Sequence, residues 1–228
     1  MNIALRQTED GSQTLYNKTI DECYHSIHGA KNESNHIFIQ SAFLQCNKQD
    51  ISIFEVGFGT GLNAFLTLLT ATKTKQKVHY ETVELYPVPS DFYSNFNYAT
   101  TKEEQSIFKK LHCSEWNRTE EITSNFSLLK HLGDIKNLEL KNHFDIVYFD
   151  AFSPEKQPEL WNKTVFEKLY NNMNTGAILT TYCAKGVVRR TLQEVGFTVE
   201  RLAGPIGKRE ILRATKVKKE NFAPTQHI

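Results

Sequence analysis

Short apolar runs alternate with helical patterns along most of this 228-residue chain. Residues 51–54 combine β-branched and aromatic side chains, as buried strands do, and in residues 62–69 the apolar positions recur at the three- and four-residue spacing of a helix. Further strands are predicted at 79–84, 127–132, 144–150, 177–182, 197–202 and 209–214, and further helices at 87–97, 103–112, 160–173 and 186–195. This alternation predicts an α/β fold with a mostly parallel sheet.

The first fifty residues follow a different pattern. Asp10-Gly11 is a strong turn dipeptide, and the flanking residues 3–7 and 14–17 can pair as a hairpin. Residues 24–36 are rich in His, Ser and Asn, which predicts a loop and permits a substrate-facing lid. The expected organisation is an N-terminal extension (1–50), an α/β domain (51–216) and a C-terminal tail (217–228).

Three glycines, Gly57, Gly59 and Gly61, separate the first strand of the α/β domain from its helix. Glycine permits a tight turn and lets a ligand lie against bare backbone, with the N–H groups of the new helix pointing at it. The spacing is G-x-G-x-G, with Glu55 two positions upstream, whereas the dinucleotide fingerprint is G-x-G-x-x-G. The variant resembles the first motif of class I S-adenosylmethionine-dependent methyltransferases. We therefore expect a small molecule to bind at this turn.

Acidic residues stand at the ends of other predicted strands. Glu84 ends the second strand, and in doubly wound folds a carboxylate at that point accepts hydrogen bonds from ribose hydroxyls. Asp150 ends the strand at 144–150 and should share the edge of the sheet with the glycine turn, because ligands of open α/β sheets bind outside the carboxyl ends of the strands. Simpler interpretations remain open: Glu84 as an exposed strand-end charge, and Asp150 as a cap on the turn before Pro154.

The composition is that of a soluble globular protein, with 39% hydrophobic and 23% charged residues. The four cysteines are scattered without metal-ligand spacing, so we expect reduced thiols and no metal site. The chain begins without the apolar run of a signal peptide, and no stretch is long and apolar enough to span a membrane. The expectation is a cytoplasmic protein with no membrane partner.

Positive charge is concentrated near the C-terminus. Residues 185–219 hold ten Lys or Arg and three Glu, a balance of +7, so the remainder of the chain carries −6 to give the total of +1. A basic segment of this kind attracts a polyanion such as RNA. Solvated helix faces and a frayed tail would explain the same charges without a partner.

Taken together, the motifs closely resemble those of one family, the methyltransferase domain of the bifunctional bacterial tRNA-modifying enzyme MnmC and its stand-alone relatives. The resemblance extends from about residue 10 to 214. It is carried by Asp10-Gly11-Ser12, Tyr24-His25-Ser26, residues 55–63, Glu84-Leu85-Tyr86-Pro87, Gly133-Asp134-Ile135, residues 149–154, Trp161, Val187-Val188-Arg189-Arg190 and Gly207-Lys208-Arg209-Glu210. It implies a seven-stranded class I (Rossmann-like) sheet whose last strand is antiparallel.

The resemblance also implies a reaction. This family transfers a methyl group from S-adenosylmethionine to the amine of 5-aminomethyl-(2-thio)uridine at the wobble position of a tRNA anticodon stem-loop, leaving S-adenosylhomocysteine. The chain ends before the flavin-dependent oxidase domain of MnmC could begin, so we expect no flavin and a separate enzyme that supplies the aminomethyl precursor. The oligomeric state is left open. The implied cofactor-binding residues are Glu55, Gly57, Phe58, Gly59, Thr60, Gly61, Asn63, Glu84, Asp134 and Asp150. Among them, Asp134 would hold the adenine amino group.

Asp150 is the candidate catalytic residue, because an acid in the pocket can orient a substrate ammonium and accept its proton or pass it to water. Phe152, Trp161 and Tyr182 are candidate stacking walls for a splayed uridine, although aromatic residues in strands and helices more often belong to the core. His25 is interpreted as a structural hydrogen-bonding residue. Candidate contacts to tRNA phosphates are Lys185, Arg189, Arg190, Lys208 and Arg209.

Three other functions remain open. A nicotinamide-dependent oxidoreductase would use the same sheet and ribose acid, but the glycine spacing and the closing strand pair disfavour it. A polyamine synthase-like aminopropyltransferase would keep the fold, take a cationic substrate and require an acid-rich pocket. A tRNA-binding module without catalysis is disfavoured, because the chain holds all four of the acidic residues Glu55, Glu84, Asp134 and Asp150.

Overall fold

Two β-sheets organise the computed structural model, which describes residues 2–218. The predicted tail at 217–228, with Lys219, therefore lies almost wholly outside the described residues. The small N-terminal sheet has the order β1 (Ile3–Gln7), β2 (Gln13–Asn17) and β3 (Glu22–Cys23). The large sheet has the order β10 (Thr198–Ala203), β11 (Glu210–Thr215), β9 (Met173–Thr181), β8 (Phe144–Phe149), β4 (Asp50–Val56), β5 (Lys77–Glu84), β7 (Phe126–Leu132) and β6 (Thr119–Thr123).

The directions of these strands confirm the predicted fold class. The five central strands, from β7 through β9, are parallel, and β11 runs antiparallel to both β9 and β10. The N-terminal hairpin also forms, with Leu5 opposite Leu15. Two strands were not predicted. The two-residue β3 pairs with β2 in the small sheet, and β6 pairs antiparallel with β7 and extends the expected seven strands of the large sheet to eight.

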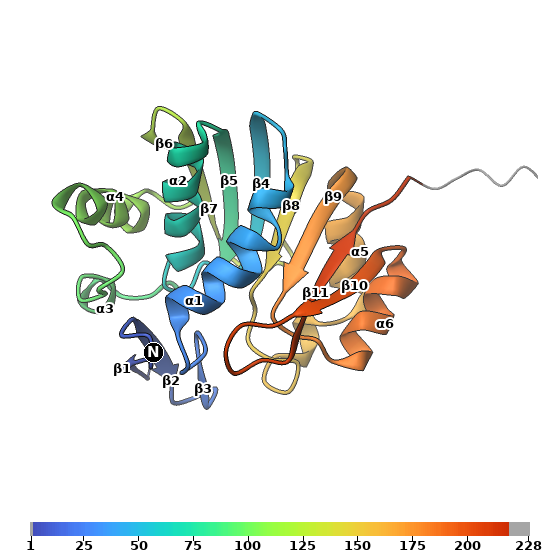
Figure 1. The fold of residues 1–228 in the computed structure, drawn as a ribbon, viewed down its shortest axis with the longest axis horizontal. Coiled ribbons are helices and arrows are strands. Elements are labelled where there is room, and N and C mark those ends of the chain that lie inside the picture. The colour runs from blue at the N-terminus through green and yellow to red at the C-terminus, as the bar shows by residue number, and fades with distance from the viewer. Residues whose placement is uncertain (1, 219–228) are drawn as a thin grey trace, which may run out of the picture.

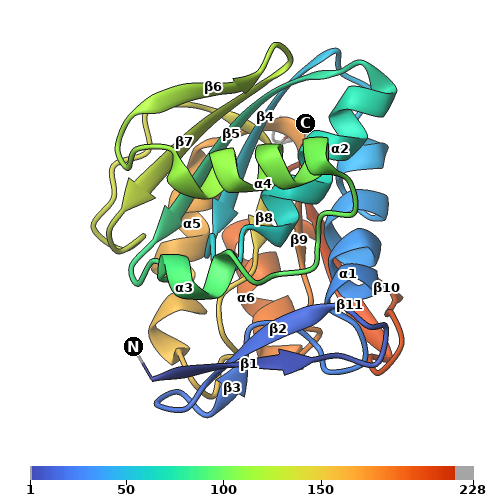
Figure 2. The ribbon, with the colours of Figure 1, turned by 90° about the vertical axis from the view of Figure 1, so that its left-hand side faces the viewer.

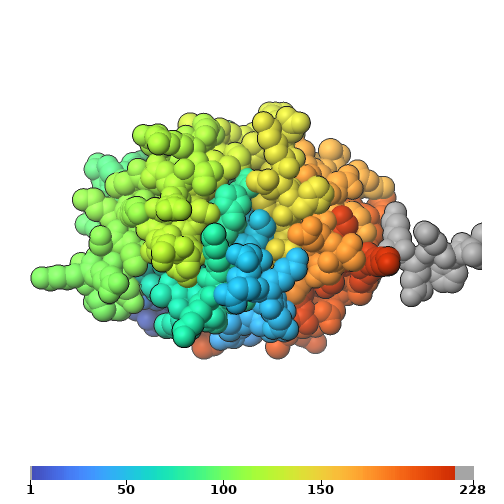
Figure 3. All heavy atoms as spheres, turned by 90° about the horizontal axis from the view of Figure 1, so that it is seen from above, coloured from blue at the N-terminus to red at the C-terminus, as the bar shows by residue number. Residues whose placement is uncertain are grey.

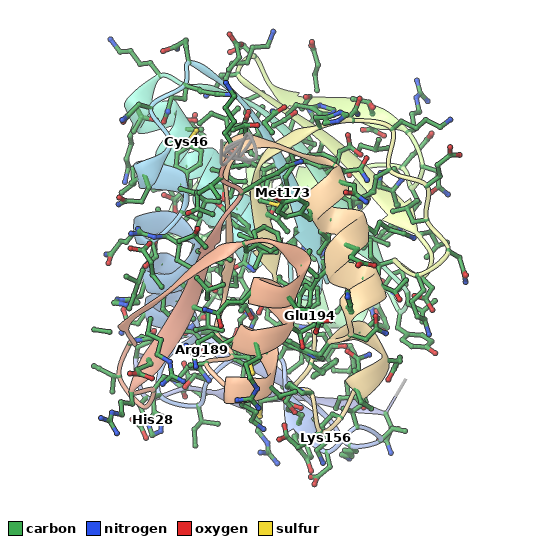
Figure 4. All side chains as sticks on the ribbon, turned by 90° about the vertical axis from the view of Figure 1, so that its right-hand side faces the viewer. His28, Cys46, Lys156, Met173, Arg189 and Glu194 are labelled. Atoms are coloured by element: carbon green, nitrogen blue, oxygen red, sulfur yellow. The ribbon has the colours of Figure 1, made fainter. Side chains whose placement is uncertain are left out.

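Helices cover both faces of the large sheet (Figures 1 and 2). One layer holds α1 (Ala30–Ser34), which continues as the π-helix Asn35–Gln40, together with α2 (Leu62–Thr74), α3 (Ser90–Tyr93) and α4 (Lys102–Cys113). The other layer holds α5 (Lys163–Asn171) and α6 (Gly186–Val195), which Figure 4 shows from their outer side. Two short 3₁₀ turns, Phe43–Gln45 and Pro158–Leu160, complete the described helical segments.

The sheet separates two apolar cores. Alternate residues of β8 face opposite sides: Ile146 and Tyr148 pack in the core under α1, α2 and α4, whereas Val147 and Phe149 pack under α5 and α6. Because both of their faces are buried, β4 and β8 read as largely apolar runs, and this is why the sequence shows these two strands clearly. Figure 3 shows the end of the molecule opposite the N-terminal sheet, where segments from many parts of the chain lie side by side.

The structure corrects several predicted boundaries. Residues 30–40 are helical, because Ile37, Phe38 and Ile39 are buried against α2, so only 24–29 of the predicted loop at 24–36 remains irregular. The helix predicted at 87–97 shrinks to the four residues of α3, which starts after Pro89. The helix predicted from 160 begins after the cap residue Asn162, whose side chain accepts from Val165 N–H at 3.0 Å.

Candidate active site

A cavity of about 260 Å³ lies between the carboxyl ends of β4, β5, β7 and β8 and the N-terminal sheet. Its position is the one at which open α/β sheets bind ligands. Most of the predicted site residues line it. They are Gly57, Phe58, Gly59, Thr60, Asn63, Glu84, Asp134, Asp150, Phe152, Tyr182 and Lys208.

The glycine turn is held close to its neighbours. Gly57 has φ +92°, and a Cβ atom there would lie 2.8 Å from the carbonyl oxygen of Asp150. Gly61, at the N-terminus of α2, has φ +71°, and a Cβ atom there would lie 2.8 Å from Nε2 of His112, whose ring bonds the Thr60 carbonyl at 3.0 Å. Gly61 itself does not line the cavity. Only glycine adopts these conformations at such close approach, so the turn presents bare backbone to the cavity.

Glu84 connects β5 to the glycine turn. Its carboxylate accepts the Gly59 N–H at 2.9 Å and the Tyr86 N–H at 2.8 Å. Burial raises its pKa, an effect that these backbone bonds partly offset. Each carboxylate oxygen retains a lone pair that can accept a hydroxyl hydrogen from a ligand.

Asn63 joins two acidic residues. Its Nδ2 donates to Glu55 at 3.0 Å and to Asp150 at 2.8 Å, and its Oδ1 has no hydrogen-bond partner within residues 2–218. Glu55 is fully buried behind Asn63 and does not line the cavity, so it differs in position from the other predicted cofactor ligands. Burial and the charge of Asp150 raise the pKa of Glu55 well above its ordinary value.

Asp150 faces the cavity at the end of β8. Burial, with a further contribution from the charge of Glu33, raises its pKa to about 7, against the hydrogen bond from Asn63 and the charge of Lys208. A carboxyl group with this pKa can both accept and release a proton at neutral pH.

Asp134 lies in a loop that a lysine of α5 fixes in place. Lys168 Nζ donates to the carbonyl oxygens of Ile135, Lys136 and Leu138 at 2.8, 2.7 and 2.9 Å. The Asp134 carboxylate accepts the Lys136 N–H at 2.9 Å and pairs with its ammonium at 3.2 Å. The loop therefore places a carboxylate and the apolar side chain of Ile135 on the cavity wall.

The N-terminal extension forms the opposite wall. Tyr24 packs edge-on against Phe152 with ring centroids 5.0 Å apart, and His25 bonds Thr14 and Thr60 at 3.2 and 3.4 Å. Burial lowers the pKa of His25 to about 4, so its ring is neutral and acts as a structural link between the extension and the glycine turn.

Trp161 takes the core position, one of the two that the sequence left open. It is buried against Phe149, with ring centroids 4.8 Å apart, and its indole N–H donates to the Phe152 carbonyl at 2.7 Å. It is therefore a core residue that supports Phe152 and not a cavity wall. Tyr182 does line the cavity, and its hydroxyl donates to the Ala151 carbonyl at 2.9 Å.

The far end of the cavity contains two residues, Glu22 and Glu33, that the sequence did not single out. Glu22 accepts from the Ser153 backbone N–H at 3.2 Å and from its hydroxyl at 2.7 Å. Glu33 accepts from the Ser26 N–H at 2.6 Å and pairs with Lys208 at 3.4 Å. The contacts of Glu22 with Ser153 and of Glu33 with Lys208 join segments more than a hundred residues apart. Local sequence patterns therefore carry no signal of these two contacts.

A second, shallower depression adjoins this end and shares Tyr182 and Lys208 with the cavity. Lys185 and Arg209 also line it, and Lys185 pairs with Glu155. Arg189 and Arg190, on the first turns of α6, line neither depression. Figure 4 shows Arg189 on α6 and His28 beside the β10–β11 hairpin.

Within the described chain no cluster of His, Cys, Asp and Glu side chains could hold a metal ion, and no helix is long and apolar enough to cross a membrane. The cavity instead fits a cationic nucleoside. It offers the bare backbone of the glycine turn, the carboxylates of Glu84 and Asp134, and apolar walls.

The comparison with protein families agrees with this geometry. Residues 98–217 match the family described as S-adenosyl-L-methionine-dependent methyltransferase, and the chain belongs to this family.

Particular relatives carry a more specific name. The chain is 31% identical over 209 residues to the tRNA 5-methylaminomethyl-2-thiouridine biosynthesis bifunctional protein MnmC of Campylobacter fetus. This alignment covers 88% of this chain and 34% of the relative. It is 26% identical over 250 residues to the protein of the same name from Actinobacillus pleuropneumoniae, covering 96% of this chain and 36% of the relative. The chain thus spans about a third of these curated relatives.

A solved structure is also similar. The crystal structure of MNMC2 from Aquifex aeolicus superposes with a TM-score of 0.78 at 29% identity and covers 95% of this chain and 71% of that one.

Proposed function

We propose that this methyltransferase methylates the amine of 5-aminomethyl-(2-thio)uridine at the wobble position of tRNA, giving 5-methylaminomethyl-(2-thio)uridine. The relatives' name, which refers to 5-methylaminomethyl-2-thiouridine biosynthesis on tRNA, supports this proposal. The observation that carries it is Asp150, a cavity carboxylate with a pKa of about 7 beside the glycine turn. The aminomethyl precursor would come from a separate flavin-dependent or other amine-forming activity.

The donor would lie along the glycine turn. Glu84 would accept the ribose hydroxyls, and Asp134 and Ile135 would meet the adenine. When bound, S-adenosylmethionine supplies an electrophilic methyl group on a positively charged sulfur.

Asp150 would prepare the acceptor. An alkylammonium has a pKa of about 10, so the substrate amine arrives protonated and has no free lone pair. Asp150 would accept one proton and leave the amine neutral. The nitrogen–carbon bond then forms as the sulfur–carbon bond breaks, and the product is a secondary ammonium.

The second depression would receive RNA phosphates. Lys185, Lys208 and Arg209 line it, and Arg189 and Arg190 lie on the adjoining helix. We predict that the affinity for precursor tRNA falls by about tenfold or more between 50 and 200 mM salt, since each neutralised phosphate releases counterions. A titration that shows no change over this range would contradict the assignment.

Lys168 is expected to support donor binding from a distance. In a Lys168→Met variant the three carbonyl groups of the Asp134 loop lose their shared donor, so we predict that affinity for S-adenosylmethionine falls by about tenfold. Lys216→Met is the matched control, because its Nζ bonds the carbonyls of Tyr170 and Met173, both at 2.7 Å, outside the cavity lining. Calorimetric titration should separate the two variants; equal losses would assign Lys168 to general stability.

The proposal is tested with purified protein, S-adenosylmethionine and tRNA that carries 5-aminomethyl-2-thiouridine. Nucleoside mass spectrometry should show conversion to the methylaminomethyl product. In cells without the protein the aminomethyl nucleoside should accumulate, and an unchanged nucleoside profile would overturn the proposal.

One observation favours a second candidate, a transferase that acts on a small polyamine. Acidic residues are frequent on the cavity wall, as such an acceptor requires. They are Glu22, Glu33, Glu84, Asp134, Asp150 and Glu159. The adjoining cationic depression favours RNA instead, and competition between precursor tRNA and spermidine in the methylation assay distinguishes the two.

A further inference from the structure

Glu33 and Lys208 face each other at the acceptor end of the cavity. Glu33 lies on α1, near the start of the chain, whereas Lys208 lies on the loop between β10 and β11. Both side chains line the cavity, and their charged atoms are 3.4 Å apart. Lys208 Nζ also lies 4.8 Å from the centre of the Tyr182 ring. The pair thus brings two distant segments together where the substrate must enter.

Glu33 has a fixed and a less constrained oxygen. Oε2 accepts the Ser26 N–H at 2.6 Å, which orients the carboxylate, whereas Oε1 faces Lys208 at the longer distance. Glu33 is only 8% exposed, and its charge reaches Asp150. A cation that enters between Asp150 and Tyr182 therefore meets two carboxylates.

Lys208 lies at the border between the cavity and the second depression. It lines the second depression as well as the cavity, together with Lys185 and Arg209. An RNA phosphate in that depression offers Lys208 an anionic partner in place of Glu33. The exchange would release Oε1 of Glu33 at the moment when the substrate occupies the site.

We propose that Glu33 is a specificity-determining residue that binds the substrate ammonium through Oε1, and that Lys208 covers this oxygen until an RNA phosphate draws it away. The inference rests on the proposed function and adds a second acid to it. Asp150 accepts a proton, whereas Glu33 holds the remaining N–H groups. Selection of an amine over a neutral group at the same position would depend on this second contact.

The test compares two tRNAs, one with 5-aminomethyluridine and one with unmodified uridine at the wobble position. The measured quantity is the ratio of their affinities, in the presence of S-adenosylhomocysteine. Glu33→Gln keeps an acceptor for the Ser26 N–H but removes the charge, so we expect the preference for the amine to fall by about tenfold, with donor affinity unchanged. An unchanged ratio would overturn the proposal. Glu9→Gln is the matched control: Glu9 pairs with His28 at 2.9 Å on the surface, and the ratio should not move.

A double variant shows whether Glu33 binds the substrate ammonium or only neutralises the charge of Lys208. If Glu33 only balances Lys208, then Glu33→Gln combined with Lys208→Met restores the wild-type ratio, and the proposal fails. If Glu33 binds the ammonium, the ratio stays low. Lys208→Met alone gives an independent test should Glu33→Gln fold poorly. Because an RNA phosphate draws Lys208 away in both complexes, this variant should weaken both tRNAs alike and leave the ratio unchanged. A raised ratio would show that Lys208 still covers Oε1 in the complex and would overturn the proposal. Absence of methylation by the wild-type protein would refute the proposed function itself, which these ratios do not address.

Discussion

Replacement of Asp150 by alanine is expected to slow methyl transfer in a single turnover by about 10²- to 10⁴-fold, because the substrate amine loses its proton acceptor. The measurement uses saturating S-adenosylmethionine and purified precursor tRNA. Because the Asp150 pKa is about 7, the wild-type rate should rise about tenfold per pH unit below pH 7 and level off above it. The variant should lack this break and continue to rise as the amine itself deprotonates.

Stability gives a control for this assignment. The folded-state pKa of Asp150 is raised above its ordinary value, so its contribution to stability is present below pH 4 and is lost as the pH rises through 7. Asp150→Asn carries no such charge and should raise the Tm of the ligand-free protein at pH 8. If the Asp150→Ala variant folds and keeps near wild-type single-turnover methylation, Asp150 is not catalytic and the turn-cap interpretation holds.

Gly57→Ala is expected to weaken the binding of S-adenosylmethionine by about 100-fold, or about 3 kcal/mol. Two costs combine. Alanine is strained at φ +92°, and its Cβ would lie 2.8 Å from the backbone oxygen of Asp150, so the turn or the end of β8 must move. Isothermal titration with the donor measures the loss.

Gly176→Ala separates these two costs. Gly176 has a similar φ of +83°, but no heavy atom lies within 4 Å of the position that its Cβ would take. This variant should lose stability through backbone strain and retain donor affinity. Equal donor affinities of the two variants would mean that close approach at Gly57 does not shape the site.

Features encoded within a few neighbouring residues were predictable. The buried strands, the glycine turn and the acids at the strand ends each depend on local spacing, and sheet topology then places Glu84 and Asp150 at one edge. The helix at 30–40 was less visible, because its polar residues resemble a loop and burial of Ile37 and Phe38 against α2 supplies the stabilisation.

Features that depend on distant contacts were not predictable. Glu33 pairs with Lys208 from the β10–β11 loop, and Glu22 accepts a hydrogen bond from Ser153, so both join the site together with segments far away in the sequence. For Trp161 the sequence left a stacking wall and a core position open, and its ring packs in the core with residues of α5. Composition alone does not tell which side of a turn an aromatic ring will occupy.

The two ends of the cavity come from separate parts of the chain. Segments 57–60, 84–86 and 133–135 line the proposed donor end, whereas Glu22, Glu33 and Lys208 line the proposed acceptor end, where Glu33 pairs with Lys208. Substitutions at Glu22, Glu33 and Lys208 remove no hydrogen bond of the glycine turn, of Glu84 or of Asp134. Descendants of one ancestral enzyme can therefore diverge in the amine that they modify while the donor cradle is inherited unchanged.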